Sequence, residues 1–365
     1  MGPRKIPGLG ERIARQISVL RAGVSQTSMR PPVLSIPTRW EEFCSSPKQF
    51  IARMAYRLYA SLLYQQKTYR PDVPTIRIVC ISDTHGLHSR LPPLPDGDIL
   101  VHAGDLTNSG TEKEVRRALD WLRTTRFQHK IFIAGNHDRA LHRPEWREPI
   151  LADYPDLIYL QDSSATLKIR GHDFIVYGTP RTPYYRRSHP FSYKRNNHPE
   201  HWITSIPKAL DILVTHSPPM GHLDIAGLGC KHLAKRLWSA RPRIHVFGHL
   251  HGGRGVARAD YGPRQDSYEL VCLQGKGWSH VLELLYGTFL LRTGLEKAGR
   301  SKHGTTLVNA AVMSTEPNQW KRREQLLDAI VVELPLVRPK PFQPRRRHDG
   351  NRSSVVVSQD GESGK

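Results

Sequence analysis

VCISDTHG (residues 79–86) is the first of five stretches in which a short apolar run ends in an aspartate, asparagine or histidine. The other four are DILVHAGDLT (98–107), IFIAGNHD (131–138), DILVTHSPP (211–219) and RPRIHVFGHLH (241–251). Apolar runs of this length, bounded by turn residues, are typical of buried strands. Helical patterns at 111–123 and 229–240 lie between them. The alternation predicts an α/β domain with buried sheets.

The expected elements extend well beyond these five stretches. Strands are predicted at 76–82, 98–103, 130–134, 173–178, 211–216 and 243–247, with later candidates at 268–273, 279–285, 305–311 and 329–334. Thr111 followed by Glu114 forms a capping box, which predicts where the first of these helices begins. The polar stretch 181–204 is long for a loop in a compact domain, which indicates a functional or disordered segment.

The polar residues that end the strands form the candidate site. In open α/β sheets, binding sites lie outside the carboxyl ends of the strands, so these side chains should meet at one edge of one sheet. The set comprises Asp83, His85, Asp105, Asn136, His216, His249 and His251. Carboxylate, amide and imidazole groups without thiolate suit Mn²⁺, iron or Zn²⁺. Seven ligands exceed the needs of one ion but suit two ions about 3.5–4 Å apart that share a carboxylate.

Each of these residues also has an ordinary structural interpretation. A single histidine at a strand end is usually a surface residue, and Asp or Asn there usually forms a turn. Because five separate strands each end in such a residue, the metal site is the favoured interpretation. Glycines at 104, 135 and 248 precede the ligands and let the backbone turn each side chain inward. Five other histidines do not occupy such a position at the end of a strand and are interpreted as structural: His88, His102, His129, His142 and His222.

The ordered blocks DTHG (83–86), GD (104–105), GNHD (135–138), a strand ending in His216, and GHLH (248–251) resemble the calcineurin-like metallophosphoesterases. The resemblance covers about residues 76–335. It is strongest to the small metallophosphoesterase-domain branch that is common in fungi and also found in animals. It implies a four-layer sandwich of two mixed β-sheets flanked by helices, with a dinuclear metal site at the carboxyl ends of the strands.

The resemblance also implies a role for each residue. Asp83, His85 and His251 would hold one metal, Asn136, His216 and His249 would hold the other, and Asp105 would bridge them. His137 would lie over the scissile phosphate as electrophile and general acid, with its other ring nitrogen oriented by Asp138. A hydroxide activated by both metals would attack phosphorus directly, without a covalent enzyme intermediate.

One position departs from the branch. Its GxPxxP loop, here GTPRTP (178–183), typically has an aromatic residue where this chain has Arg181. Arg181 would either contact an anionic substrate or belong to a solvated loop face.

Three functions compete. The first is a phosphoesterase that hydrolyses phosphodiesters, including cyclic nucleotides, or small phosphomonoesters, with two divalent ions (Mn²⁺ favoured over iron and Zn²⁺). The second is a nuclease-type phosphodiesterase acting on nucleic acid, which the basic composition suggests. The third is a metal-binding scaffold with vestigial activity. The intact ligand set favours the first. The oligomeric state is left open.

The formal net charge of the 365 residues is +21. Residues 1–75 hold 12 Lys or Arg against 4 Asp or Glu, and residues 336–365 hold 7 against 3. More than half of the excess therefore lies in the flanks, either as solvated tails or as contacts to nucleic acid or acidic lipid. This location makes nucleic acid the less favoured partner.

We expect four regions: a basic segment at 1–40 that is disordered or serves targeting, a helical extension and linker at 41–74, the phosphoesterase domain at 75–335, and a disordered basic tail at 336–365. Ile13, Ile17, Leu20 and Val24 recur at helical spacing among arginines, as in a mitochondrial presequence or any exposed helix. The helix expected at 49–66 carries a stripe of Phe50, Met54, Leu58 and Leu62, which Ile51, Tyr59 and Leu63 widen. That stripe would dock on the domain or lie on a membrane surface.

The cysteines and the hydropathy of the sequence indicate which cellular compartment to expect. The four cysteines are widely spaced without a CxxC, so free thiols in a reducing compartment are expected. No stretch has the roughly 18 apolar residues that a membrane span needs, and no secretory signal is visible. A cytoplasmic protein is expected, with mitochondrial or membrane-peripheral placement as alternatives.

Overall fold

The computed structural model describes residues 38–65, 73–184, 189–195, 200–208, 210–296, 304–313 and 326–337. The predicted helix around Ile13–Val24 and the basic tail beyond residue 337 lie outside the described residues, and the division into four regions stays a prediction. None of the helices in the described ranges is long and apolar enough to cross a bilayer.

The first sheet holds the amino-terminal strands of the domain. Its order is β13-β1-β2-β3-β4, with β13 antiparallel to β1 and the other neighbours parallel. The strands are β1 (Thr75–Ile81), β2 (Ile99–His102), β3 (His129–Phe132), β4 (Ile158–Tyr159) and β13 (Ile330–Pro335). All four residues of β2 are buried, as expected for a parallel strand covered on both faces.

The second sheet is also mixed. Its order is β11-β12-β10-β9-β6-β5, in which the outer pairs β11–β12 and β5–β6 are antiparallel and the inner neighbours are parallel. The strands are β5 (Ser163–Ile169), β6 (His172–Thr179), β9 (Ile212–Thr215), β10 (Ile244–Phe247), β11 (Gly255–Ala259) and β12 (Thr305–Asn309). A small separate pair, β7 (Thr182–Tyr184) with β8 (Ser192–Lys194), lies in the predicted loop.

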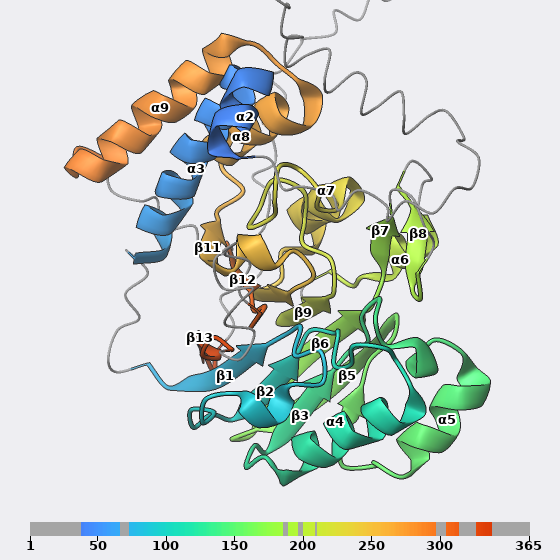
Figure 1. The fold of residues 1–365 in the computed structure, drawn as a ribbon. Coiled ribbons are helices and arrows are strands. Elements are labelled where there is room, and N and C mark those ends of the chain that lie inside the picture. Colours follow the sequence, from blue (N-terminus) through green and yellow to red (C-terminus); the bar gives the residue numbers. More distant parts are fainter. Residues whose placement is uncertain are drawn as a thin grey trace, which may run out of the picture.

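The two sheets pack face to face between helices, which confirms the expected fold class (Figure 1). Alternate residues of both sheets, such as Ile78 and Val246, form the core between them. The outer face of the first sheet packs against α4 (Glu112–Thr124) and α5 (Pro144–Ala152). The outer face of the second packs against α7 (Lys231–Ala240). The capping box of Thr111 and Glu114 is present at the start of α4, as predicted.

A further helical cluster covers β11 at one end of the molecule. It consists of α3 (Pro47–Gln65), α8 (Pro263–Gln274) and α9 (Trp278–Thr293), with α2 (Arg39–Ser45) beside α3. The short α6 (Glu200–Ser205) lies near α7. Figure 1 shows α3, α8 and α9 together, away from the first sheet. The helix predicted at 49–66 therefore docks on the rest of the chain.

Two of the predicted strands are wrong. The runs 268–273 and 279–285 lie inside α8 and α9. Short apolar runs do not distinguish a strand from a buried helix, and α9 is apolar on two sides, so it shows no helical period. The strands predicted at 305–311 and 329–334 are confirmed as β12 and β13.

The face of α3 that packs overlaps the predicted stripe only in part: Tyr59 and Leu63 are buried, and Ile51 and Leu62 are partly buried. Met54 and Leu58 are exposed, whereas Ala52, Ala55 and Ala60 are buried together with Tyr56 and Tyr59. Alanines let the helix axes approach closely, so the small residues face the neighbours and the larger ones turn outward.

Candidate metal centre

Five strand ends from both sheets converge on one point. Backbone hydrogen bonds join the segments that follow the strands: the Asp83 amide donates to the Gly104 carbonyl at 2.9 Å, and the Gly248 amide donates to the His216 carbonyl at 3.1 Å. Within the described chain, three overlapping groups of side chains have ligand atoms within 4.8 Å of one another. All of the predicted aspartate and histidine ligands belong to these groups.

Asp83, His85 and His251 form the first group. Asp83 is buried, and its carboxylate accepts the His249 backbone N–H at 3.0 Å. One of its oxygens lies 3.2 Å from His251 Nε2. The Nδ1 atom of His85 is buried and has no hydrogen-bond partner. This group comes from the ends of β1 and β10, which lie in different sheets, so the prediction that the ligands share the edge of one sheet is wrong.

Asp105, His216 and His249 form the second group. His216 is buried, and its Nδ1 lies 2.9 Å from the carbonyl oxygen of Ala103. A carbonyl oxygen can accept a hydrogen bond but cannot donate one. Nδ1 therefore donates to that carbonyl, and Nε2 is the ring nitrogen that faces the site. The side-chain oxygen of Asn136 lies 3.1 Å from that Nε2, which places Asn136 beside this group.

Asp105 connects the two groups. Its Oδ2 lies 3.3 Å from His216 Nε2 and 3.8 Å from His85 Nε2. Its other oxygen accepts the His137 backbone N–H at 2.8 Å, which fixes the orientation of the carboxylate. One oxygen of a single buried carboxylate thus faces ligands from both groups.

The charges of the site balance one another. Burial alone would raise the pKa of Asp83, but His251 outweighs it and lowers the pKa to about 2. The same competition, with His216 as partner, lowers the pKa of Asp105. Burial would lower the pKa of His216, but Asp105 raises it to about 9. Burial lowers the pKa of His249 to about 3. Both carboxylates are therefore ionised at neutral pH, as a cation requires.

Four of the candidate ligands have a left-handed backbone that residues with a Cβ rarely adopt. The φ angles are 59° at Asp83, 45° at His85, 54° at Asp105 and 65° at His249. Each such residue costs about 1–3 kcal/mol, and such residues concentrate at functional sites. The strained backbone thus occurs at the positions where a side chain must turn back toward the strand ends.

These observations fit a pair of divalent cations. The donors are carboxylate, imidazole and amide, without thiolate, and they lie on two sides of one shared carboxylate oxygen. The unpartnered Nδ1 of His85 is a further buried donor atom in the same place.

Gly135 leaves no room for a side chain beside the shared carboxylate. A Cβ there would overlap Oδ1 and the backbone nitrogen of Asp105 and would come within 2.7 Å of His216 Cε1. We therefore expect Gly135→Ala to lower the free energy of unfolding by about 3 kcal/mol and to weaken metal binding. Gly277→Ala is the matched control, because a Cβ at Gly277 meets nothing within 4 Å. Urea denaturation and metal titration of both variants test this, and equal behaviour of the two would contradict it.

His137 is held differently from the prediction. Its Nδ1 lies 2.8 Å from the backbone carbonyl of Asn108, not near Asp138. The Asp138 carboxylate is buried and accepts hydrogen bonds from the amides of Leu106, Thr107 and Gly135 and from the Thr107 hydroxyl. The prediction that Asp138 orients the ring is therefore wrong, because its oxygens are already used to join the two ligand-bearing loops.

Arg181 lies in an ion pair. Its guanidinium donates to one oxygen of Asp162 from Nη2 at 2.9 Å and from Nε at 3.1 Å. Asp162 also accepts the Thr179 hydroxyl at 2.7 Å. The charge of Arg181 is thus already paired, and its role as a substrate contact stays a prediction.

Asn309 is a positioning residue that the sequence reasoning missed. It is buried at the end of β12, and its Nδ2 donates to the carbonyls of Leu223 and Leu250 at 3.0 and 2.9 Å. It thereby holds the loop that carries His249 and His251. Asn309 ends an apolar strand as the predicted ligands do, so the same signal was available.

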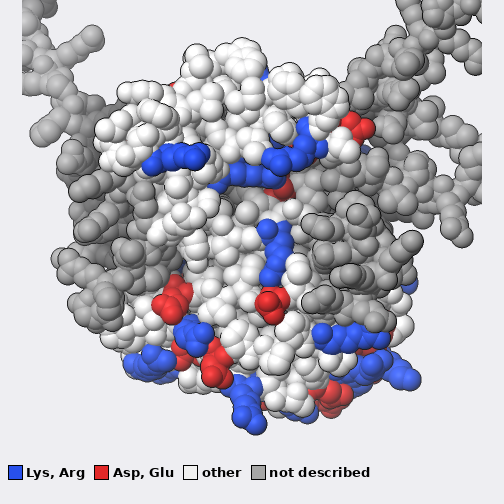
Figure 2. Space-filling model, turned by 60° about the vertical axis from the view of Figure 1, so that its left-hand side comes forward, with Lys and Arg blue, Asp and Glu red and all other residues white. Residues whose placement is uncertain are grey.

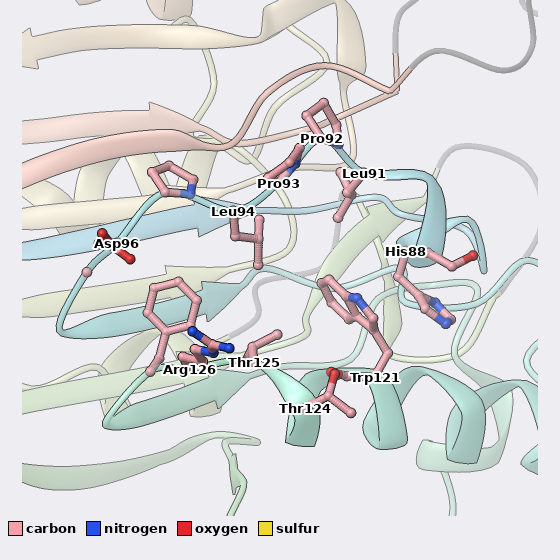
Figure 3. Close-up of a pocket in the computed structure, with 14 residues that line it drawn as sticks. His88, Leu91, Pro92, Pro93, Leu94, Asp96, Trp121, Thr124, Thr125 and Arg126 are labelled. Atoms are coloured by element: carbon pink, nitrogen blue, oxygen red, sulfur yellow. The ribbon is translucent and has the colours of Figure 1, made fainter.

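The concave surface drawn in Figure 3 lies outside the candidate site. It is a cavity of about 380 Å³ between the loop 91–97 and the end of α4. His88 and Trp121 lie at one end of it, with ring centroids 5.3 Å apart, and Asp96 and Arg126 lie at the other. None of the predicted site residues lines this cavity.

Comparisons with known proteins agree with this geometry. Residues 76–253 match the family model of calcineurin-like phosphoesterases. The chain is 39% identical over 302 residues to a "Probable rhamnogalacturonate lyase C" of Emericella nidulans, which covers 81% of this chain and 27% of that protein. It is 37% identical over 209 residues to metallophosphoesterase domain-containing protein 1 of Homo sapiens, covering 49% of this chain and 62% of that one.

A UPF0046 protein of Caenorhabditis elegans is 35% identical over 217 residues, 52% of this chain and 75% of that protein. The chain thus spans only part of the first relatives named here: about a quarter of the fungal protein and less than two thirds of the human one. The family match at residues 76–253 spans every predicted ligand position.

Proposed function

Because the chain belongs to the calcineurin-like phosphoesterase family, as its predicted resemblance indicated, we propose that it is a metal-dependent phosphoesterase that hydrolyses small phosphodiesters. The observation that carries the proposal is the Asp105 carboxylate, one oxygen of which faces both His216 and His85 at 3.3 and 3.8 Å. A shared carboxylate between two ligand groups is the arrangement that two-metal hydrolases use.

In this proposal, each ligand group holds one ion. Asp83, His85 and His251 bind the first, and Asn136, His216 and His249 bind the second, with Asp105 between them. Two divalent ions bound there, with Mn²⁺ favoured, would neutralise the phosphate oxygens and lower the pKa of a bound water. The buried carboxylates and the Ala103 carbonyl, which fixes the ring of His216, keep the ligand atoms in place.

His137 acts on the substrate rather than on the metals in this proposal. Its Nδ1 donates to the Asn108 carbonyl, so that Nε2 is left for the reaction. The ring lies edge to face with His85, with centroids 4.7 Å apart, at the border of the ligand groups. From there a protonated Nε2 would bind a phosphate oxygen and donate its proton to the leaving alkoxide. Asp138 supports this position by joining the loops of Thr107 and Gly135.

The test is hydrolysis of bis(p-nitrophenyl) phosphate and p-nitrophenyl phosphate by the full chain, after chelation and with Mn²⁺ restored. We expect turnover that depends on the metal and favours the diester. A preference for the monoester would make the protein a phosphatase. Turnover of single-stranded nucleic acid alone, with a steep loss at high salt, would favour the nuclease alternative. A metal-loaded chain inert toward all three would contradict the proposal and favour the scaffold.

A further inference from the structure

The outer face of α9 carries a stripe of large apolar side chains. Their exposed fractions are 52% at Trp278, 63% at Leu282, 41% at Leu285, 65% at Tyr286 and 57% at Phe289. The spacing of i, i+4, i+7, i+8 and i+11 places all five on one side of a helix with 3.6 residues per turn. We call this set the α9 stripe.

Among the described residues, none of the core clusters includes a member of the α9 stripe. The opposite side of the helix already supplies the packing residues, because Val281, Leu284 and Leu291 are buried against α3 and α8. A helix that is apolar on both sides is expected in a core or at an interface. Contiguous exposed apolar patches of this kind mark sites of association with proteins or membranes. Two of the five side chains, Trp278 and Tyr286, combine a large apolar ring with a polar atom, which suits a boundary between lipid and water.

The charges around the α9 stripe are basic, and the acidic groups are engaged elsewhere. Lys276 lies in the turn before the helix, and Arg292 lies in its last turn. Glu283 accepts the Ser267 hydroxyl at 2.7 Å, and Glu296 pairs with Arg264. Figure 2 shows the result: the upper part of that face is largely uncharged, with Lys and Arg side chains gathered below it.

The amino-terminal extension adds to this basic character. Lys48 at the start of α3 donates to the Gly275 carbonyl at 2.8 Å, so the beginning of α3 lies next to the turn that precedes α9. The 38 residues that precede α2 contain 6 Lys or Arg and 1 Glu. A strongly basic stretch of chain therefore joins the molecule at this end.

We propose that the α9 stripe binds the surface of an anionic lipid bilayer. The apolar side chains would enter the interface, and the basic groups around them would face the acidic headgroups. A second copy of the chain is the less favourable occupant, because each copy carries a formal charge of +21 and the two would repel. Binding of this kind requires no membrane-spanning helix.

The test is sedimentation of the full chain with vesicles of phosphatidylcholine, alone or with about one third phosphatidylserine. We expect binding to the anionic vesicles that weakens as salt is raised. Leu282→Ser combined with Phe289→Ser should reduce the partition coefficient at least about tenfold. Trp278→Ser should reduce it severalfold, whereas Trp146→Ser should not, although both tryptophans are 52% exposed. Trp146 lies on α5, which makes this a matched control.

Three results would overturn the proposal. The first is equal vesicle binding by the wild type and the double variant, since binding would then come from the basic segments alone. The second is failure of the wild type to bind anionic vesicles. The third is a dimer in the absence of lipid that the double variant dissociates, which would assign the α9 stripe to self-association. Unchanged thermal unfolding and unchanged hydrolysis of the diester verify that the variants are folded.

Discussion

Asp105→Asn is expected to reduce turnover by at least about a thousandfold, which corresponds to about 4 kcal/mol of transition-state stabilisation. The buried carboxylate of Asp105 offers one oxygen to both ligand groups, so the loss of its charge weakens both metals at once. The amide has the same shape and retains an oxygen to accept the His137 backbone N–H, so the fold should survive. Metal content measured by atomic emission, alongside diester hydrolysis, checks this result.

A matched control comes from Asp96, which lies in the cavity of Figure 3 outside the candidate site. Asp96→Asn makes the same chemical change and should leave turnover and metal content unchanged. If Asp105→Asn retained two metals per chain and full activity, the bridging assignment would be wrong, and the two ligand groups would be independent sites.

His137→Ala should reduce turnover about a hundredfold to a thousandfold while two metals per chain remain bound. The side chain has its Nδ1 on the Asn108 carbonyl and acts at the border of the ligand groups in our proposal. Its proximity to His85 and Asp105, within 4.8 Å by ligand atoms, makes metal content the decisive measurement. A loss of metal in this variant would show that His137 is a ligand. His172→Ala, an exposed histidine of β6, is the control.

The sequence was sufficient to predict the inner strands of both sheets, such as β1, β2, β9 and β10, but not β4, β5 or β11. Strands such as β2 and β10 are fully buried, so they appear as continuous apolar runs with clear ends. The polar residue that follows each apolar run then lies at the carboxyl edge of its sheet, because the strand ends there. Asp83 and Asp105 meet for this reason, because they follow parallel strands of the first sheet, whereas His216 follows β9 of the second sheet, so its approach depends on how the two sheets pack.

What the sequence did not predict depends on packing. The strands expected at 268–273 and 279–285 lie inside the helices α8 and α9. A helix that is apolar on two sides lacks the 3.6-residue repeat of apolar positions, so the sequence pattern does not identify it as a helix. The partner of His137 is a backbone carbonyl, which no residue type reveals. The pairing of Arg181 with Asp162 joins residues of two different segments and depends on how β6 leaves the sheet. Left-handed backbone at Asp83 and Asp105 is likewise enforced by neighbours rather than by residue preference.

The placement of β12 and β13 has a consequence for how the chain is made. Both strands lie beyond residue 253, where the family match ends, yet β12 lies between β10 and β11, and β13 pairs with β1. Strand β1 thus receives its last partner some 250 residues later, at roughly 5–20 residues per second. Until then, the nascent sheet has an open edge, and Asn309 cannot hold the loop of His249. Metal acquisition should therefore follow the synthesis of β12 and β13 rather than precede it.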